Sequence, residues 1–578
     1  MKEYIKNLKF AWQYCKDQKT RIIIFMITNI LIIITGIIIP VINAQEILKL
    51  TNNQIYQFVI MGVIVFLAYS LKELFLFIVR KQMQIIYRET YIKMQTELGK
   101  EILKLENKSL DKNSSGVFIQ RLTGDVSVIS DSFNLAFDYL TDFLQVVGIF
   151  LAILILNFWV FLFCIFMTIM LSIFKQYQTN IFKKDNKEYK KAEEEVTGFT
   201  GEVVRGARDI KMLNAEKSFM KIMKEKITNM NQKAYIRGNH NKNYNLIGSF
   251  IINSIDLGTV ILLAVFILKG KLEVATALVL YNYSFRVTDV SYIISGFLSA
   301  AQNFNLSCER VIAIINDDEF KKETFGNKHL NKVDGNFEFQ NVSFAYDDKE
   351  VLNNLSFKIN ANETVAFVGK SGAGKTTIFN LLTKMYNVNS GKILIDGVNI
   401  NELDKDTIRG NITVISQNPY IFNLSIKENL KLVKEDLTDE EMHEACKIAC
   451  LEEFINTLPD KYDTIVGEGG ISLSGGQKQR LAIARALVQK TEIILFDEAT
   501  SALDNETQYE IQKAIQNMQG KYTILMIAHR LSTIINSDRI LFLNNGQIEA
   551  EGTHQTLLQT SENYRHLYET EIKTGHNK

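Results

Sequence analysis

One short segment near residue 370 has the residue types and spacing of a phosphate-binding loop. It reads Gly369, Lys370, Ser371, Gly372, Ala373, Gly374, Lys375 and Thr376, which matches GxxxxGK[ST] once in the chain, and Thr377 follows it. The apolar stretch TVAFV precedes it and the helical stretch TIFNLLTKM follows, as the motif requires. Glycines let backbone N–H groups converge on phosphates, and the helix N-terminus adds its dipole. We expect ATP to bind here, with Lys375 beside the β- and γ-phosphates and the Thr376 hydroxyl on Mg²⁺.

Two acidic residues end a second apolar stretch. Asp497 and Glu498 follow IILF, which predicts a buried strand. A carboxylate at a strand end is suited to hold the Mg²⁺ shell, and its neighbour to polarise the attacking water. On its own, the pair would also suit a helix cap. A phosphate loop in the same domain favours the catalytic interpretation, with Asp497 on the metal and Glu498 as the base.

A third segment predicts another helix N-terminus that faces an anion. Ser474, Gly475, Gly476 and Gln477 follow Leu473 and open the basic helical stretch KQRLAIARAL. A serine hydroxyl and flexible glycines at a helix start are suited to phosphate binding. Two explanations stay open for a second such site. One chain binds two nucleotides, or two chains pair head to tail and each covers the nucleotide of the other.

These motifs require an α/β domain with a largely parallel core, and the second part of the chain predicts one. Buried strands are expected at ETVAFVG and EIILFDE, with helices between them, and FEFQNVSFAY alternates like an exposed edge strand. Residues 331–578 carry 25 basic and 34 acidic side chains, whereas the rest carries 40 and 30. The net charge of the whole chain is +1, which argues against a nucleic-acid partner.

The first part of the chain predicts a membrane domain of six helices. Each expected span approaches the roughly 20 apolar residues that cross a bilayer. The spans are about 22–44, 55–79, 137–156, 158–176, 246–268 and 272–298. The N-terminal segment and the long loops 80–136 and 177–245 are rich in lysine and arginine, which predicts that both termini and these loops are cytoplasmic. The loops have helical patterning, so we expect the membrane helices to continue into the cytoplasm.

Together, the motifs and spans resemble an ATP-binding cassette exporter of the half-transporter type, and the resemblance covers nearly the whole chain. It implies a transmembrane domain at 1–316, a polar linker at 317–336 and a nucleotide-binding domain at 337–578. It also implies that Tyr346 stacks on adenine, that Gln417 senses Mg²⁺, that Asp504 belongs to the SALD loop, and that His529 contacts the γ-phosphate. The cytoplasmic loops resemble those that carry short coupling helices, with KNSSG and Met212–Ser218 as the candidate positions.

The resemblance implies ATP-driven export by alternating access across a bacterial cytoplasmic membrane. In a dimer, Lys375 of one chain would share a nucleotide with Ser474 of the other. A homodimer is the first expectation. Alternatives are one half of a heterodimer, a dedicated exporter of bacteriocin or signal peptides, and a membrane-anchored ATPase that moves no cargo. An amphipathic drug, a lipid or a peptide are all possible substrates.

Charged residues inside the spans are the sequence's main indication of a substrate cavity. Asp256 lies near the middle of the fifth span, and Arg286 and Asp289 lie three residues apart in the sixth. Charges at membrane depth usually face an interior cavity. Mutual pairing of Arg286 with Asp289 on one helix is the simpler alternative. We expect these three residues to line the cavity.

Overall fold

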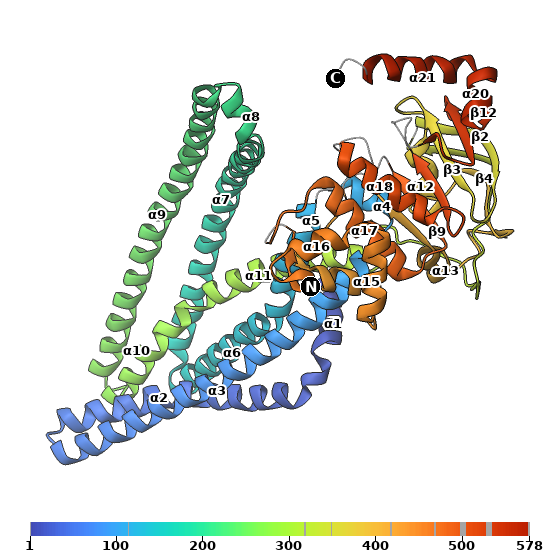
Figure 1. Ribbon diagram of the computed structural model, residues 1–578. Helices are drawn as coiled ribbons and strands as arrows, with labels where there is room; N and C mark the ends of the chain where they lie inside the picture. The colour runs from blue at the N-terminus through green and yellow to red at the C-terminus, as the bar shows by residue number, and fades with distance from the viewer. Residues whose placement is uncertain are drawn as a thin grey trace. The chain divides into compact units, whose positions relative to one another are not determined.

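The computed structural model describes residues 2–113, 115–316, 319–347, 349–416, 419–467, 470–497, 505–527 and 534–575. The chain divides into two compact units (Figure 1). The helical unit comprises Met1–Lys104 and Ser114–Phe320. The α/β unit comprises Leu105–Asn113 and Lys321–Lys578. A short piece of the first predicted cytoplasmic loop therefore packs with the α/β unit.

Helices of 6 to 53 residues form the helical unit. They are α1 (Lys2–Cys15), α2 (Lys19–Thr51), α3 (Ile55–Ile102), α5 (Ser115–Gln120), α6 (Val126–Leu156), α7 (Phe158–Arg205), α8 (Ala207–Met212), α9 (Glu216–Leu268), α10 (Val274–Thr288) and α11 (Val290–Ile315). A short 3-10 helix, Lys16–Gln18, joins α1 to α2, and a π-helical turn, Arg121–Asp125, joins α5 to α6. The 48 residues of α7 extend about 70 Å at 1.5 Å each, more than twice the hydrocarbon thickness. Helices α7 and α9 lie side by side (Figure 1).

Among the described residues, five helical segments are long and apolar enough to cross a membrane. They contain the first five predicted spans. Over the sixth, 272–298, α10 ends at Thr288 and α11 begins at Val290, and the backbone of Asp289 between them keeps right-handed helical angles. Arg286 near the end of α10 and Asp289 form an ion pair of 3.6 Å. The sixth span therefore stays a prediction.

In the described residues, two large sheets and one small two-stranded antiparallel sheet build the α/β unit. Its elements are α4 (Asn107–Lys112), β1 (Phe337–Tyr346), β2 (Lys349–Ile359), β3 (Thr364–Gly369), α12 (Lys375–Leu382), β4 (Ser390–Ile395), β5 (Val398–Asn399), α13 (Lys405–Asn411), β6 (Ile412–Ile415), β7 (Leu424–Ser425), α14 (Ile426–Lys431), α15 (Asp439–Ile448), α16 (Glu452–Thr457), the 3-10 helix Lys461–Asp463, β8 (Ile465–Val466), α17 (Gly475–Gln489), β9 (Ile493–Asp497), α18 (Asn505–Met518), β10 (Thr523–Ile527), β11 (Arg539–Asn544), β12 (Gln547–Gly552), α20 (His554–Thr560) and α21 (Glu562–Gly575). In the described residues, β12-β11-β3-β10-β9-β6 form a six-stranded sheet. Its pairs are parallel except β11–β12. All six residues of β3 are buried, as its apolar run predicts.

The second sheet is antiparallel and has the order β2-β1-β4-β5. Strand β1 pairs with β2 on one side and with β4 on the other, so the expectation of an edge strand is wrong. Alternation in FEFQNVSFAY reports one buried face, here with Phe337 and Phe339 almost fully covered. It does not report whether the strand has neighbours on both sides.

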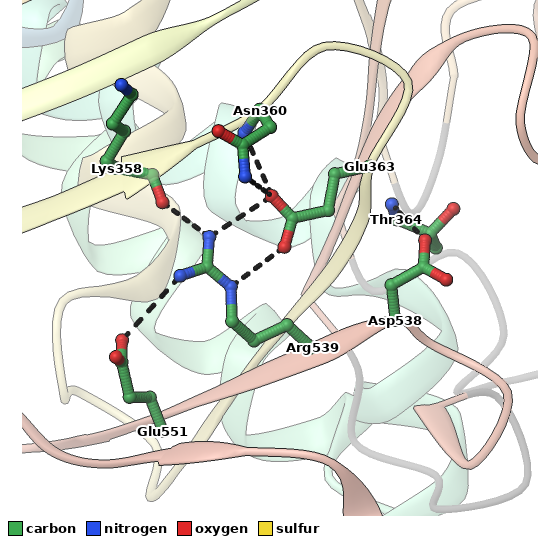
Figure 2. Close-up of polar contacts among 7 residues, drawn as sticks. All are labelled: Lys358, Asn360, Glu363, Thr364, Asp538, Arg539 and Glu551. Carbon is green, nitrogen blue, oxygen red and sulfur yellow. Dashed lines mark hydrogen bonds and ion pairs between the residues drawn. The ribbon is translucent and has the colours of Figure 1, made fainter.

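A cluster of polar contacts fixes the start of β3, the strand that leads into the phosphate loop. Figure 2 shows Arg539 of β11 directed at Glu363, with its Nε 2.8 Å from Oε1 and a terminal nitrogen 3.2 Å from Oε2. Asp538 accepts a hydrogen bond of 2.8 Å from the Thr364 backbone N–H. Arg539 also donates to the Lys358 carbonyl at the end of β2. These bonds tie β2, β3 and β11 together at the end of β3 remote from the loop.

The polar segment predicted as a linker carries no helix or strand in residues 319–336, yet it is bound to the α/β unit. Glu323 receives a two-pronged ion pair from Arg409, and the Phe325 ring lies 5.1 Å from the Lys384 ammonium. Backbone bonds join Gly326 to Leu403 at 2.8 Å. A Cβ at position 326 would lie 2.0 Å from the Glu402 backbone, so glycine permits this close approach.

Candidate nucleotide site

The predicted phosphate loop joins the buried strand β3 to the N-terminus of α12. Lys375 is only 5% exposed, and its Nζ donates hydrogen bonds of 2.9 Å to the Gly369 carbonyl and 3.0 Å to the Lys370 carbonyl. The backbone thus curls around the ammonium group. Gly374 has φ +98°, and a Cβ there would lie 2.6 Å from Leu352 Cδ2. Glycine is needed at this position for both reasons.

A pocket of about 560 Å³ lies over this loop. Seven of its lining residues come from the predicted set: Tyr346, Ser371, Gly372, Gly374, Lys375, Thr376 and Thr377. Others were missed by the sequence argument: Lys349, Glu350, Val351, Asn353, Asn545 and Gly546. The Asn-Gly pair predicts a hairpin turn between β11 and β12. Its contact with the pocket depends on tertiary packing, in which the Gly546 carbonyl accepts a 3.2 Å bond from Asn353.

Tyr346, predicted to stack on adenine, lines the same pocket. Its hydroxyl accepts a 3.1 Å hydrogen bond from Asn380 Nδ2. Its ring packs edge-on against Phe344 and Tyr386, with centroids 4.8 and 5.1 Å away. The structure therefore brings Tyr346 to the phosphate loop and holds its ring on three sides.

Two of the three predicted metal ligands, Thr376 and Asp497, lie close together. Thr376 Oγ1 lies 3.4 Å from Asp497 Oδ1, so a hydroxyl and a carboxylate converge beside the loop. Oxygen donors of this kind fit Mg²⁺, which commonly takes few protein ligands and keeps waters or phosphate oxygens. Gln417, Glu498, Asp504 and His529 lie outside the described residues.

The predicted second phosphate site opens helix α17. The Ser474 hydroxyl accepts a 3.2 Å bond from the Gln477 N–H, and the Gln477 side chain accepts a 2.8 Å bond from the Ser474 N–H. This reciprocal cap leaves Ser474 and Gly475 exposed, whereas Gly476 is buried. Among the described residues that line the nucleotide pocket, none belongs to 473–477. The exposed helix start is thus not part of the pocket of its own chain.

Comparison with known proteins identifies the family. The chain matches the ABC transporter transmembrane region over residues 22–288 and the ABC transporter family over residues 352–501. An uncharacterized ABC transporter ATP-binding protein of Bacillus subtilis is 30% identical over 98% of this chain and 94% of its own length. The chain belongs to the ABC transporter family. An ATP-dependent lipid A-core flippase of Haemophilus influenzae is 34% identical, with 82% of this chain and 81% of the flippase covered.

The fold is also similar to that of a solved ABC exporter. A bacterial Atm1-family ABC exporter solved with ATP bound superposes with a TM-score of 0.80 at 24% identity, covering 96% of this chain and 98% of the exporter. A putative multidrug export protein of B. subtilis is 34% identical over 82% of each chain. The resemblance to a cassette exporter is confirmed: this transporter is a multi-pass membrane protein, binds ATP and couples its hydrolysis to export.

The three predicted cavity residues of the transporter lie on α9, on α10 and at the junction of α10 with α11. Asp256 lies on α9 and interacts with Tyr281 of α10. Arg286 and Asp289 pair with each other, and their side chains are 57% and 48% exposed. Lys72 of α3 and Asp142 of α6 lie within electrostatic range of Arg286, which the sequence argument did not foresee. Helix packing, rather than sequence spacing, brings these groups together.

Proposed function

We propose that this transporter exports an amphipathic substrate, a drug, a lipid or a peptide, from the cytoplasm of a bacterium. It acts as a dimer in the cytoplasmic membrane, with both termini cytoplasmic. The observation that carries the proposal is the buried Lys375 in a phosphate loop of a chain whose described residues also include five apolar helical segments of membrane length. Relatives named as a lipid A-core flippase and as a putative multidrug exporter support the substrate class.

The catalytic roles follow from the loop geometry and from the family. Thr376 and Asp497, joined by Gln417, would hold Mg²⁺, which neutralises charge on the phosphates when bound. Glu498 takes a proton from the attacking water, and His529 holds the γ-phosphate. The nucleotide's phosphates rest on the N–H groups between Gly369 and Thr377, and its base rests on Tyr346. Across the dimer, Ser474, Gly475, Gly476, Gln477 and Asp504 complete each site.

Coupling between nucleotide and cargo requires that ATP bind one conformation better than another. A nucleotide held between two half-sites meets this condition, because only the closed pair of cassettes contacts it fully. Asp256, Arg286 and Asp289 line the cavity that this closure turns outward. A heterodimer with a related chain would use the same chemistry.

Uptake into sealed inside-out vesicles tests this function. We expect ATP-dependent accumulation of at least one of three probes: a fluorescent phospholipid, a fluorescent amphipathic dye and a labelled peptide. Glu498→Gln should abolish uptake and steady-state hydrolysis while ATP binding survives, because removal of a general base costs about 10²- to 10⁴-fold in rate. Hydrolysis without uptake of any probe would favour the ATPase that moves no cargo.

A further inference from the structure

The short helix α4 is bound to the cassette at two points beside Tyr346. The Tyr386 hydroxyl donates a 2.5 Å hydrogen bond to Asp111 Oδ2. Lys108 and Lys112 place their ammonium groups 3.0 and 3.1 Å from Asp347 Oδ1. Asp347 directly follows Tyr346 in the chain, and Tyr386 packs on its ring. Helix α4 therefore contacts both the sequence neighbour and the ring neighbour of the aromatic residue in the nucleotide pocket.

Tyr346 contributes to the walls of two pockets in the α/β unit. One is the nucleotide pocket, and the other, of about 580 Å³, is lined by residues of α4 together with Tyr386. The planes of the Tyr346 and Tyr386 rings are inclined at 84°, an edge-to-face packing. A shift of Tyr386 would have to turn the Tyr346 ring or leave a gap beside it, because packed rings have few alternative positions.

The two contacts of α4 differ in strength. The lysines and Asp347 are more than half exposed, although the two lysines lower the pKa of Asp347 by hydrogen bonding and charge. Exposed ion pairs of this kind change an equilibrium by at most about fivefold. The Tyr386 side chain is half-buried, and burial followed by the bond to Asp111 raises its pKa. A hydrogen bond to an ionised acceptor is roughly twice as strong as a neutral one. Tyr386 is thus the stronger connection.

We propose that Tyr386 is a positioning residue through which α4 sets the affinity of the nucleotide pocket for the base of ATP. The inference rests on the proposed function, since it takes Tyr346 as the residue that contacts the base. Energetic coupling between two sites is reciprocal, so binding of the base also strengthens the attachment of α4. Lys375 of the phosphate loop bonds to the backbone of its own loop, so we expect binding of the phosphates to be independent of Tyr386.

Equilibrium titration of the full-length protein in lipid nanodiscs, with a Mg²⁺ chelator to prevent turnover, tests the proposal. ATP and inorganic tripolyphosphate are compared, because the second ligand has phosphates and no base. Tyr386→Phe keeps the ring and removes the hydroxyl. We expect a loss of about threefold to tenfold in ATP affinity, the range for one hydrogen bond, and unchanged tripolyphosphate affinity. Asp111→Ala should match Tyr386→Phe, and Asp111→Asn should recover part of the loss.

Two controls make the result decisive. Tyr522→Phe removes the hydroxyl of another half-buried tyrosine, in a hollow with Glu441 and Lys490, and should change neither affinity. Lys375→Ala should lower the affinity for both ATP and tripolyphosphate. If it lowers neither affinity, the proposed nucleotide site itself is wrong. Unchanged ATP affinity in Tyr386→Phe, or an equal loss for ATP and tripolyphosphate, would overturn the positioning role.

Hydrogen exchange supplies an independent measurement. Amides of Leu105–Asn113 should exchange more slowly in wild-type protein with saturating ATP than with saturating tripolyphosphate. The difference should vanish in Tyr386→Phe, because the base no longer communicates with α4. Equal protection by both ligands in the wild type would contradict the reciprocal part of the proposal.

Discussion

At the scale of single residues, the charges inside the membrane spans interact with one another. Arg286 forms an ion pair with Asp289, and Lys72 and Asp142 lie within its electrostatic range. An isolated charge at the bilayer centre costs about 2.5–3.5 kcal/mol on insertion scales. Asp289 and Asp142, which are opposite in sign to Arg286, lower that cost, whereas Lys72 has the same sign. Arg286 and Asp289 stay about half exposed within the chain, so we expect an aqueous cavity to solvate them.

An aqueous cavity at these positions would make cysteines placed there reactive. In a variant without its five natural cysteines, cysteine at position 256, 286 or 289 should react with a small hydrophilic thiol reagent in the resting state. Cysteine at position 66 is the control, since Phe66 lies in an apolar span and is 68% exposed in the chain, where we expect lipid. Complete protection at all three positions in active protein would mean that they are buried between helices.

At the scale of elements, the phosphate loop depends on a strand that is fixed at its opposite end. Arg539 and Glu363 are largely covered, with side chains 24% and 14% exposed, and they join the start of β3 to β11. Removing the guanidinium leaves the Glu363 carboxylate with only its bonds from Asn360 (Figure 2). Strand β3, which carries Gly369 at its other end, would then be less firmly held at its start.

Substitution of Arg539 should therefore lower the stability of the cassette. We expect Arg539→Ala to reduce the free energy of unfolding by about 1–3 kcal/mol, the range for hydrogen bonds between charged groups. Arg539→Lys should lose less, because it keeps the charge without the paired geometry. Glu551→Gln is the matched control: the Glu551 side chain is more than half exposed, and its 3.8 Å pair with Arg539 should contribute under about 1 kcal/mol. Thermal unfolding followed by intrinsic fluorescence measures these shifts, and equal values for Arg539→Ala and Glu551→Gln would contradict the argument.

The sequence predicted elements whose signal is local. TVAFV is buried in β3 because a continuous apolar run needs cover on both faces. GKSGAGKT forms the phosphate loop because its glycine and lysine spacing, between a strand and a helix, is specific for that loop. The sequence did not predict the pairing of β1 on both sides or the binding of Glu323 by Arg409. Each of these depends on a partner distant in the chain. Tyr386 could not be predicted from the sequence for the same reason, because its neighbours Asp111 and Tyr346 lie 275 and 40 positions away in the chain.

At the scale of the whole molecule, the two phosphate-type sites in one cassette require an explanation. The start of α17 is exposed and contributes no described residue to the nucleotide pocket of its own chain. A single chain that bound two nucleotides would need a pocket around Ser474 built from its own residues. A second chain placed head to tail would supply a further wall for both sites, and a homodimer would carry every ATPase motif in each copy.

Cysteine crosslinking distinguishes these arrangements. Cysteines are placed at positions 371 and 474 in a background without natural cysteines. We expect ATP to promote disulfides between chains, because closure should bring the phosphate loop of one chain to the start of α17 in the other. Cysteines at 392 and 474 are the control, since Lys392 lies on β4 outside the pocket and should give no crosslink. Mixing Ser474→Arg chains with Lys375→Ala chains should also restore one undamaged composite site in some dimers. Exclusively intrachain products, which run as monomers on a denaturing gel, would show that each chain completes its own site and that the head-to-tail dimer is wrong.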